Sequence, residues 1–444
     1  MECQISAAGL EKKVSRMLVR NVCLVVFLIG ATVPAARAQI SCAPGSAAAI
    51  KLSCLIPNAV TPSGSALVTS PTNANSQLGN SFGFLTSDVG GELSQIPLAS
   101  PASGIIFTTD PTLHVPVPSD QSLGPILTQR SDTIGKHKLY VAGTYQYFLL
   151  QDVDGISLNN LPSTFFFSST GGASADTLGV TNGILDLKIH QFVGYATFGL
   201  TDRIDVSVAV PLLRVQMRYT DSEVLYKLNN PSVPVGSVIH NSLAQQATGI
   251  GDIVLAFKDN VWKLKRGGGF AFGAEFRLPT GDAQNFLGSG AYGLKPFGTF
   301  TYGAVVSPHL NIGYQINSAS QLVFGSGGYP RLPNRLIYSG GADWRVARRL
   351  TVAADVLEQR VFNAPRATLL ANPFLFPTSS GSSAQVPSAI STTFGDYNRT
   401  DGSIGVKIKP YGNLLVTGNV IIRADDGGLR TGRVVPLAGI SYTF

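Results

Sequence analysis

The last nine residues of the chain follow a period of two. Every second residue is apolar, and the residues between them are mostly small or polar. Pro436, Ala438, Ile440, Tyr442 and Phe444 fall on one face of an extended strand, and Leu437, Gly439, Ser441 and Thr443 fall on the other. Such alternation with an aromatic carboxy terminus is typical of a strand that turns one face to lipid and the other to a lumen. It predicts the closing strand of an outer-membrane barrel.

The same alternation recurs after Gly135 in runs of roughly ten residues. These runs predict strands near 137–150, 184–199, 203–219, 249–262, 270–279, 292–306, 309–318, 335–346, 350–361, 399–410, 413–424 and 433–444. In lipid, only a closed barrel satisfies the backbone hydrogen bonds of strands. We therefore expect residues 133–444 to form an all-β domain, a single antiparallel transmembrane β-barrel of about twelve strands.

The connections between the predicted strands provide a second test of this count. Those after even-numbered strands are short, as at 200–202 and 411–413, whereas those after odd-numbered strands are mostly long, as at 152–183, 220–248 and 363–398. Barrels of bacterial outer membranes have short periplasmic turns and longer extracellular loops. Both ends of the predicted barrel therefore lie on the periplasmic side.

The amino terminus has the features of a secretory signal. Four basic residues between 12 and 20 precede the apolar run Val22 to Val33, and Ala36-Arg37-Ala38 forms a small-x-small cleavage pattern. A membrane-spanning helix needs about 20 apolar residues, which is more than this run supplies. We expect residues 1–38 to be a signal peptide and the protein to be exported to the bacterial outer membrane.

Residues 39–132 are rich in Ser, Pro, Ala and Thr and are interrupted by Pro every few residues, so they cannot form barrel wall. Two interpretations remain open: a periplasmic extension, or a plug folded into the barrel mouth. Gly104–Phe107 and Leu123–Leu127 are apolar enough to need cover. This favours at least partial docking of the segment.

Composition agrees with a barrel and excludes other classes. Charged residues are 13% of the chain, about half the share usual in soluble domains, and Gly is frequent at 48 residues. Loss of the signal removes five basic and two acidic residues and lowers the formal charge from +7 to +4. This weak balance, without basic clusters interleaved with aromatics, argues against a nucleic-acid partner.

Few residues suggest covalent or metal chemistry. Cys3 and Cys23 leave with the signal, so Cys42 and Cys54 remain as a candidate disulfide in an oxidising compartment. Closing that short loop would contribute about 3 kcal/mol in the chain-entropy model. The five His form no cluster with Cys or carboxylates at ligand spacing, so the sequence indicates no metal site and no cofactor.

The polar face of each predicted strand supplies candidates for the lumen. They are Asp186, Lys188, His190, Asp205, Asp252, Lys258, Glu275, Arg277, Lys295, Asp343, Arg345, Asp355, Lys407, Lys409 and Arg423. The set is mixed in sign. It either supports the barrel through pairs among its members and with a plug, or forms a polar constriction with a modest basic bias.

His240-Asn241-Ser242 suggests a different function. A His and a Ser two apart on one strand face are the arrangement used by outer-membrane phospholipase A, but here the triplet falls in a long predicted loop and Leu243-Ala244 follows it. A hydrolase is therefore an alternative, with no catalytic residue assigned. A second alternative is an anchor whose long loops, such as 363–398, serve attachment.

Four segments carry a resemblance to a known family: Thr248–Ile253 leading to Phe257-Lys258, Phe276–Asp282, Asn311–Tyr314 and Tyr338–Trp344. With this order and spacing, residues 135–444 resemble the outer-membrane channel family named for the meta-pathway of phenol degradation, whose members are regarded as transporters. The resemblance implies a monomeric barrel, not an enzyme, that passes small hydrophobic or aromatic compounds. We expect membrane lipid, a small solute and the barrel-assembly machinery, through the strand ending at Phe444, as partners.

Overall fold

The protein is described from a computed structural model. It describes residues 51–60, 66–67, 107–109, 116–118, 122–168, 177–227, 230–234, 238–264, 267–320, 322, 331–370, 375–377, 383–385 and 389–444. The predicted signal peptide, Cys42 and residues 104–106 fall outside this part of the chain. So does most of the predicted irregular segment 39–132.

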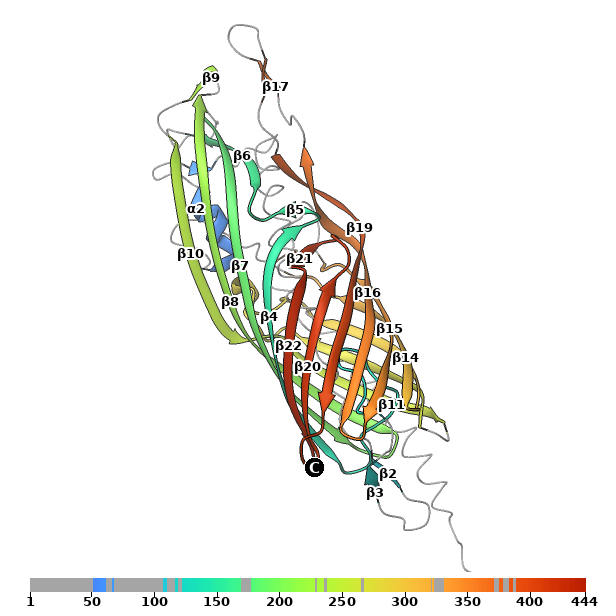
Figure 1. Cartoon of the computed structure of the whole chain (residues 1–444). Helices are drawn as coiled ribbons and strands as arrows, with labels where there is room; N and C mark the ends of the chain where they lie inside the picture. Colours follow the sequence, from blue (N-terminus) through green and yellow to red (C-terminus); the bar gives the residue numbers. More distant parts are fainter. Residues whose placement is uncertain are drawn as a thin grey trace, which may run out of the picture. The chain divides into compact units, whose positions relative to one another are not determined.

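Within the described residues, twelve antiparallel strands close into one barrel, counting β10 and β11 together because both pair with β8 (Figure 1). The wall consists of β4 (Leu139–Val153), β7 (Thr177–Gly199), β8 (Ile204–Lys227), β10 (Ile239–Ile250) with β11 (Ile253–Lys263), β12 (Gly268–Leu278), β13 (Gly293–Tyr302), β14 (Val306–Asn317), β15 (Arg335–Ala347), β16 (Leu350–Leu370), β19 (Ala389–Ile408), β20 (Leu414–Arg423) and β22 (Val434–Thr443). The prediction of an all-β barrel of about twelve strands is confirmed.

Short elements accompany the wall. They are η1 (Leu52–Cys54), α2 (Leu55–Val60), β1 (Ala66–Leu67), β2 (Phe107–Thr109), β3 (Pro116–Pro118), β5 (Ile156–Ser157), β6 (Leu161–Ser168), β9 (Asn230–Pro234), η2 (Ala283–Asn285), β17 (Leu375–Pro377), β18 (Ser383–Gln385) and β21 (Leu429–Thr431). No helix among the described residues is long and apolar enough to cross a membrane.

The last strand closes the barrel against the first. Strand β22 pairs with β4, with Tyr442 opposite Val141, and β4 pairs in turn with β7. The backbone N–H of Phe444 donates to the carbonyl of Leu139, so pairing continues to the end of the chain. Closure leaves no free sheet edge, whose backbone N–H and C=O groups would find no hydrogen-bond partner in hydrocarbon.

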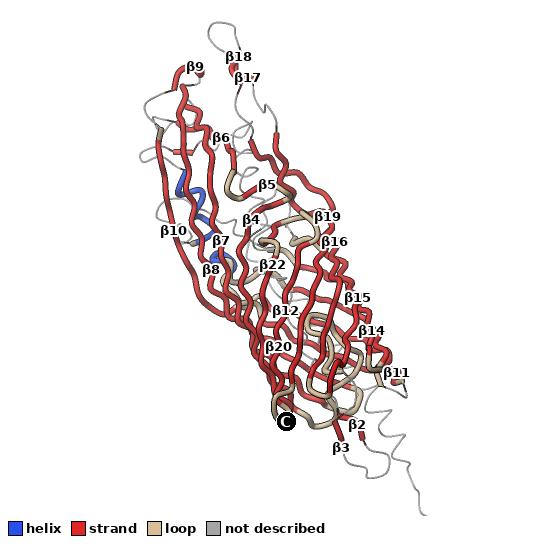
Figure 2. The backbone as a smooth tube through the Cα atoms, viewed as in Figure 1, coloured by secondary structure: helices blue, strands red, loops and turns tan. Residues whose placement is uncertain are grey.

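Short turns gather at the end of the barrel where the C-terminus lies, and the longer connections lie at the other end (Figure 2). The long connections are shorter than the sequence predicted. Residues 220–248, expected to be one loop, are largely strand, because β8 continues to Lys227 and β10 starts at Ile239. Strand β8, with 24 residues, is about twice the length that a membrane crossing requires.

The outward face of the wall carries large apolar side chains. In β22, Ile440 and Phe444 are 55% and 62% exposed, whereas Leu437 is 3% exposed, as the alternation predicted. Across the neighbouring strands Tyr145, Phe192, Leu212 and Ile250 lie side by side and exposed. These four residues are called the girdle row below.

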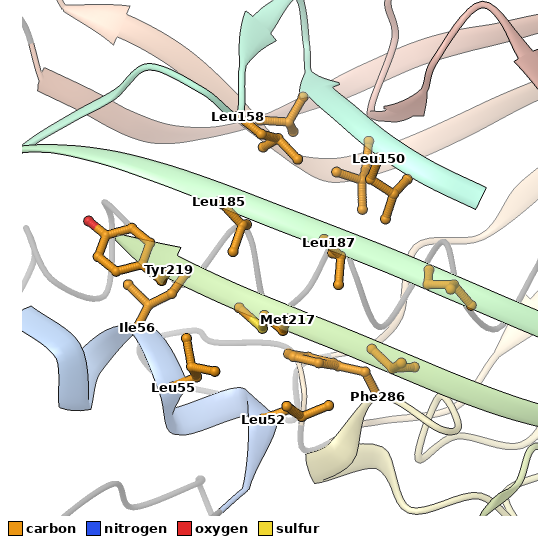
Figure 3. Packing of buried hydrophobic residues seen from close by; sticks show 14 of the residues in the cluster. Leu52, Leu55, Ile56, Leu150, Leu158, Leu185, Leu187, Met217, Tyr219 and Phe286 are labelled. Atoms are coloured by element: carbon orange, nitrogen blue, oxygen red, sulfur yellow. The ribbon is translucent and has the colours of Figure 1, made fainter. Parts of the chain in front are cut away.

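Beyond the girdle row, toward the long loops, the interior is apolar as far as Tyr219 of β8, and the buried carboxylates of Asp221 and Glu223 follow on the same inward face. Leu55 and Ile56 of α2 pack against inward side chains of β7 and β8, among them Leu187 and Met217 (Figure 3). Cys54, at the end of η1, is buried and disulfide-bonded. Its predicted partner Cys42 lies outside the described residues.

The outward position of Ile440 yields a first prediction. Ile440→Arg would place a cation on the lipid face and should destabilise the folded barrel by about 2–4 kcal/mol, because charge near the bilayer midplane loses its hydration. Urea unfolding in lipid vesicles, followed by heat-dependent gel mobility, measures the change. Ile440→Leu is the control and should shift the midpoint little; equal stability of the two variants would show that this face does not meet lipid.

Candidate functional site

An irregular segment, Ser122–Ile134, lies inside the barrel and is called the plug below. All of its residues except Leu127 and Gln129 are buried. Its hydrogen bonds go to residues of many wall strands, including β11 on one side of the barrel and β19 on the other. The site is therefore a lumen occupied by the chain's own amino-terminal part.

Lys258 of β11 holds one end of the plug by its backbone. Its Nζ donates to the carbonyl oxygens of Arg130 at 3.1 Å and Asp132 at 2.6 Å. The side-chain amide of Asn260, two residues along the strand, donates to the carbonyl of Ser131 at 2.9 Å. Because the acceptors are carbonyls, this clamp depends little on which side chains the plug carries.

Lys407 of β19 holds the other end in the same way. Its Nζ donates to the carbonyl of Leu123 at 3.3 Å and to that of Pro125. Between them, Gly124 has φ +83°, and a Cβ there would lie 2.8 Å from the Arg130 guanidinium. The guanidinium turns back to donate to the carbonyl of Ser122 at 3.2 Å, so the plug folds on itself.

A buried hub of one imidazole and two carboxylates contacts the middle of the plug. In His309 of β14, Nδ1 lies 3.2 Å from Asp343 and Nε2 lies 2.6 Å from Asp355. The plug reaches both carboxylates, because Ser122 donates to Asp343 and Thr128 donates to Asp355 at 3.3 Å. Buried carboxylates need such partners, so the plug contributes to satisfying the wall.

Two further predicted lumen residues bind the plug. Asp205 accepts from the backbone N–H of Ile134 at 3.1 Å and lies 3.8 Å from the Lys258 ammonium. Glu275 accepts from the side-chain amide of Gln129 at 2.9 Å and pairs with Lys295 at 2.7 Å. The predicted lumen residues of opposite charge thus pair with one another around the plug.

The remaining predicted lumen residues lie elsewhere along the barrel. Arg277 is buried and donates to Asn317 at 2.7 Å, and Arg423 donates to Asp152 at 2.7 Å near the long-loop end. Arg345 and Lys409 lie near the short-turn ends of β15 and β19 and are partly exposed.

The lumen placement is wrong for Asp186, Lys188 and His190. Their neighbours Leu185, Leu187 and Ile189 fill the interior cluster, so these three polar side chains face outward. The physical reason is that β7 continues beyond the girdle row, and a strand that passes the apolar belt of a barrel is expected to meet water there. There the polar face turns out and the apolar face turns in.

Several buried charged residues were not predicted. On the barrel wall they are Asp221, Glu223, His309, Arg335, Arg399, Asp401 and Arg430. Three of them could have been found from alternation, because His309 precedes the outward Leu310, and Arg399 and Asp401 share a face with Lys407. Arg430, whose guanidinium lies 2.7 Å from Asp401, comes from a short strand without a recognisable period.

Two of the sequence segments that resemble a known family meet in space. Asp252 accepts hydrogen bonds from the backbone N–H groups of Gly281 at 3.1 Å and Ser289 at 2.8 Å, and from the Ser289 hydroxyl at 2.5 Å. Thr280 donates to the carbonyl of Gly251 at 2.7 Å. Asp252 therefore anchors the β12–β13 connection instead of lining open lumen.

The same connection holds the helical segment. Asp282 caps η2 by accepting from the N–H of Gln284, and it pairs with Lys51 at 2.7 Å. Partial burial alone would raise the pKa of Asp282, but the hydrogen bond and charge of Lys51, together with hydrogen bonds from Asn285, outweigh burial and lower that pKa. Beside this pair a pocket of about 570 Å³ borders β10, lined among others by Ile250 and Leu287.

The candidate hydrolase residues lie on a strand, which corrects their predicted position in a loop. His240 and Ser242 are both on the outward face of β10. The hydrogen bond of His240 goes to Ser222 of β8, with Nδ1 3.1 Å from its Oγ. Within the described residues there is no group of three or more His, Cys, Asp or Glu arranged to hold a metal ion.

Comparison with known proteins agrees with the motifs. The family described as "Putative MetA-pathway of phenol degradation" matches residues 172–322, which confirms the resemblance seen in the sequence. No curated protein matches the chain in sequence.

Among solved structures, the chain is similar to an outer membrane channel from Pseudomonas putida F1, with 11% identity, 71% of this chain and 99% of that chain covered, and a TM-score of 0.40. It is also similar to a Pseudomonas aeruginosa FadL homologue, with 11% identity, 77% and 96% covered, and a TM-score of 0.33. The Pseudomonas putida toluene transporter TodX has 9% identity, 69% and 89% covered, and a TM-score of 0.27.

The three hydrogen bonds to Asp252 predict a large loss of stability when its carboxylate is removed. Asp252→Ala leaves the N–H groups of Gly281 and Ser289 without their acceptor and should cost about 2–4 kcal/mol. Asp252→Asn keeps one acceptor oxygen and should cost about half as much. Urea unfolding of the refolded barrel measures this order of stability. Equal stability of the Asp252→Asn and Asp252→Ala variants, or stability of both equal to that of the unmodified chain, would contradict the prediction.

The Lys407 clamp predicts a looser plug when its ammonium is removed. Lys407→Met should weaken docking by about 1–3 kcal/mol, because two plug carbonyls lose a charged donor. Arg130 is buried in the docked plug. Because about 1.4 kcal/mol corresponds to a factor of ten in the population of undocked plug, trypsin cleavage after Arg130 should become about tenfold faster or more.

Lys409→Met, two residues further along the chain and just past the short-turn end of β19, is the matched control and should leave cleavage unchanged. If Arg130 of the unmodified barrel is cut as fast as in Lys407→Met, the clamp does not hold the plug.

Proposed function

We propose that the protein is an outer-membrane channel for small hydrophobic or aromatic solutes, closed at rest by its plug. The class of protein is supported by the closed barrel with an apolar outer face and by the family match over residues 172–322. The solute class comes from the resemblance and from the chemistry of the interior.

The observation that carries the solute class is the apolar interior beyond the girdle row. Leu187, Val215 and Met217 line the inner face there and pack with α2. An aromatic solute that enters such a lining is removed from water, which is favourable by about 25 cal/mol per Å² of apolar area. A sugar would instead lose hydrogen bonds to water without replacement.

The pocket beside β10 supports an entry point. It is bordered by Ile250, which is exposed on the outer face, and by Leu287, which belongs to the interior apolar cluster. A solute in this pocket would touch both the surroundings of the barrel and its apolar interior. Passage onward then requires displacement of the plug, whose contacts with the wall are mostly polar and reversible.

Solute flux through purified barrels in liposomes tests the proposal. We expect the full chain to admit little phenol or toluene, and a chain lacking residues 39–132 to admit at least about tenfold more, since the plug's bonds to Asp343 and Lys407 are lost. Arabinose should enter more slowly than phenol through the opened barrel. These fluxes also separate a channel from a hydrolase or a non-transporting anchor.

A variant of full length guards against misfolding of the deletion. Ser122→Ala with Thr128→Val removes the two hydroxyls that reach Asp343 and Asp355 and should also raise flux, though less than the deletion. Ile440→Leu is the matched control on the outer face and should leave flux unchanged. A barrel that folds in every form and admits no solute in any of them would contradict transport.

A further inference from the structure

The outer face beyond the girdle row carries several cationic side chains on β7 and β8. One row above Phe192 and Leu212 lie His190 and Arg214, which are cross-strand partners. The next row holds Lys188 opposite the neutral Gln216, and the row after it holds Arg218 opposite Asp186. Rows are two residues apart, so each step along the strand is about 7 Å.

The charges in these rows are incompletely neutralised. Asp186 pairs with Lys188 at 2.7 Å, and Arg214 donates from Nη2 to the neutral side chain of Gln246 at 2.9 Å. Arg214 and Arg218 are exposed. On another part of the barrel the exposed Arg360 is paired with Asp396 at 3.2 Å.

The position of the patch indicates what it meets. The girdle row is apolar and exposed, so acyl chains can lie against Phe192, Leu212 and Ile250, while a headgroup would reach Arg214 one row above. Guanidinium groups bind phosphate through paired, charge-assisted hydrogen bonds. An apolar row followed directly by cationic rows matches an amphipathic anion better than a free one.

We propose that Lys188, Arg214 and Arg218 form a binding site for the phosphate groups of phosphorylated glycolipids in the outer leaflet of the membrane. The inference rests on the outer-membrane location in the proposed function, although it does not depend on transport. The acyl chains of the bound lipid lie on the girdle row, and its phosphates bind the three cations.

Native mass spectrometry of the purified full-length barrel tests the site. The probes are bisphosphorylated lipid A, the same lipid without phosphates, and inorganic phosphate. We expect the triple variant Lys188→Gln, Arg214→Gln and Arg218→Gln to bind bisphosphorylated lipid A at least about tenfold more weakly. The unmodified barrel should bind the dephosphorylated lipid as weakly as the variant does.

The matched control removes three exposed cations from the short-turn end: Lys136→Gln, Arg348→Gln and Arg349→Gln. It should bind lipid A as the unmodified barrel does, and heat-dependent gel mobility verifies that every variant is folded. Equal affinity of the triple variant and the unmodified barrel overturns the site. Displacement of lipid A by millimolar inorganic phosphate also overturns it, because the surface would then take a free anion.

Solute flux measured on the same preparations separates this inference from the proposed function. A barrel that passes phenol but shows no phosphate-dependent lipid affinity removes the lipid site alone. A barrel that binds bisphosphorylated lipid A selectively but passes no solute supports the lipid site and contradicts the channel.

Discussion

Each strand has two faces, and the medium that meets the outer face decides what the inner face must contain. Between the short turns and the girdle row the outer face is apolar, and the inner face carries the paired charges that hold the plug. Beyond Phe192 and Leu212 the outer face is polar, and the inner face packs α2 with Leu187 and Met217. The polar and apolar faces of the strands thus change sides at the girdle row. The position of the plug, of the apolar interior and of the outer cationic residues all follow from this change.

The plug is held mainly through its backbone, which explains its composition. Lys258 and Lys407 donate to carbonyl groups, an acceptor that every residue supplies. A Ser-rich and Pro-rich segment without secondary structure can therefore dock, provided that Gly124 allows the chain to turn. Buried polar contacts of this kind contribute little net stability compared with apolar packing, so they suit a segment that leaves the lumen in the proposed channel.

Strand number and barrel closure could be predicted because strands with one apolar face show a two-residue period in the sequence, as at Ile440, Tyr442 and Phe444. Alternation separates two faces but does not say which is inside, so Asp186, Lys188 and His190 were misplaced. The partners of Lys258 and the anchoring role of Asp252 could not be predicted, since the plug and the β12–β13 connection have no period. Their contacts join residues over a hundred positions apart, as between Lys258 and Arg130, or link two connections on either side of the β11–β12 hairpin, as between Asp252 and Ser289.

Disulfide trapping between the plug and the wall tests the account most directly. Leu123 of the plug packs on the inward Leu415 of β20, whereas the next residue, Val416, faces outward. Oxidation of membranes that carry Leu123→Cys with Leu415→Cys should join the two positions, and Leu123→Cys with Val416→Cys should remain unlinked. A missing link at position 415, or equal linking at 415 and 416, would show that the segment does not occupy the lumen.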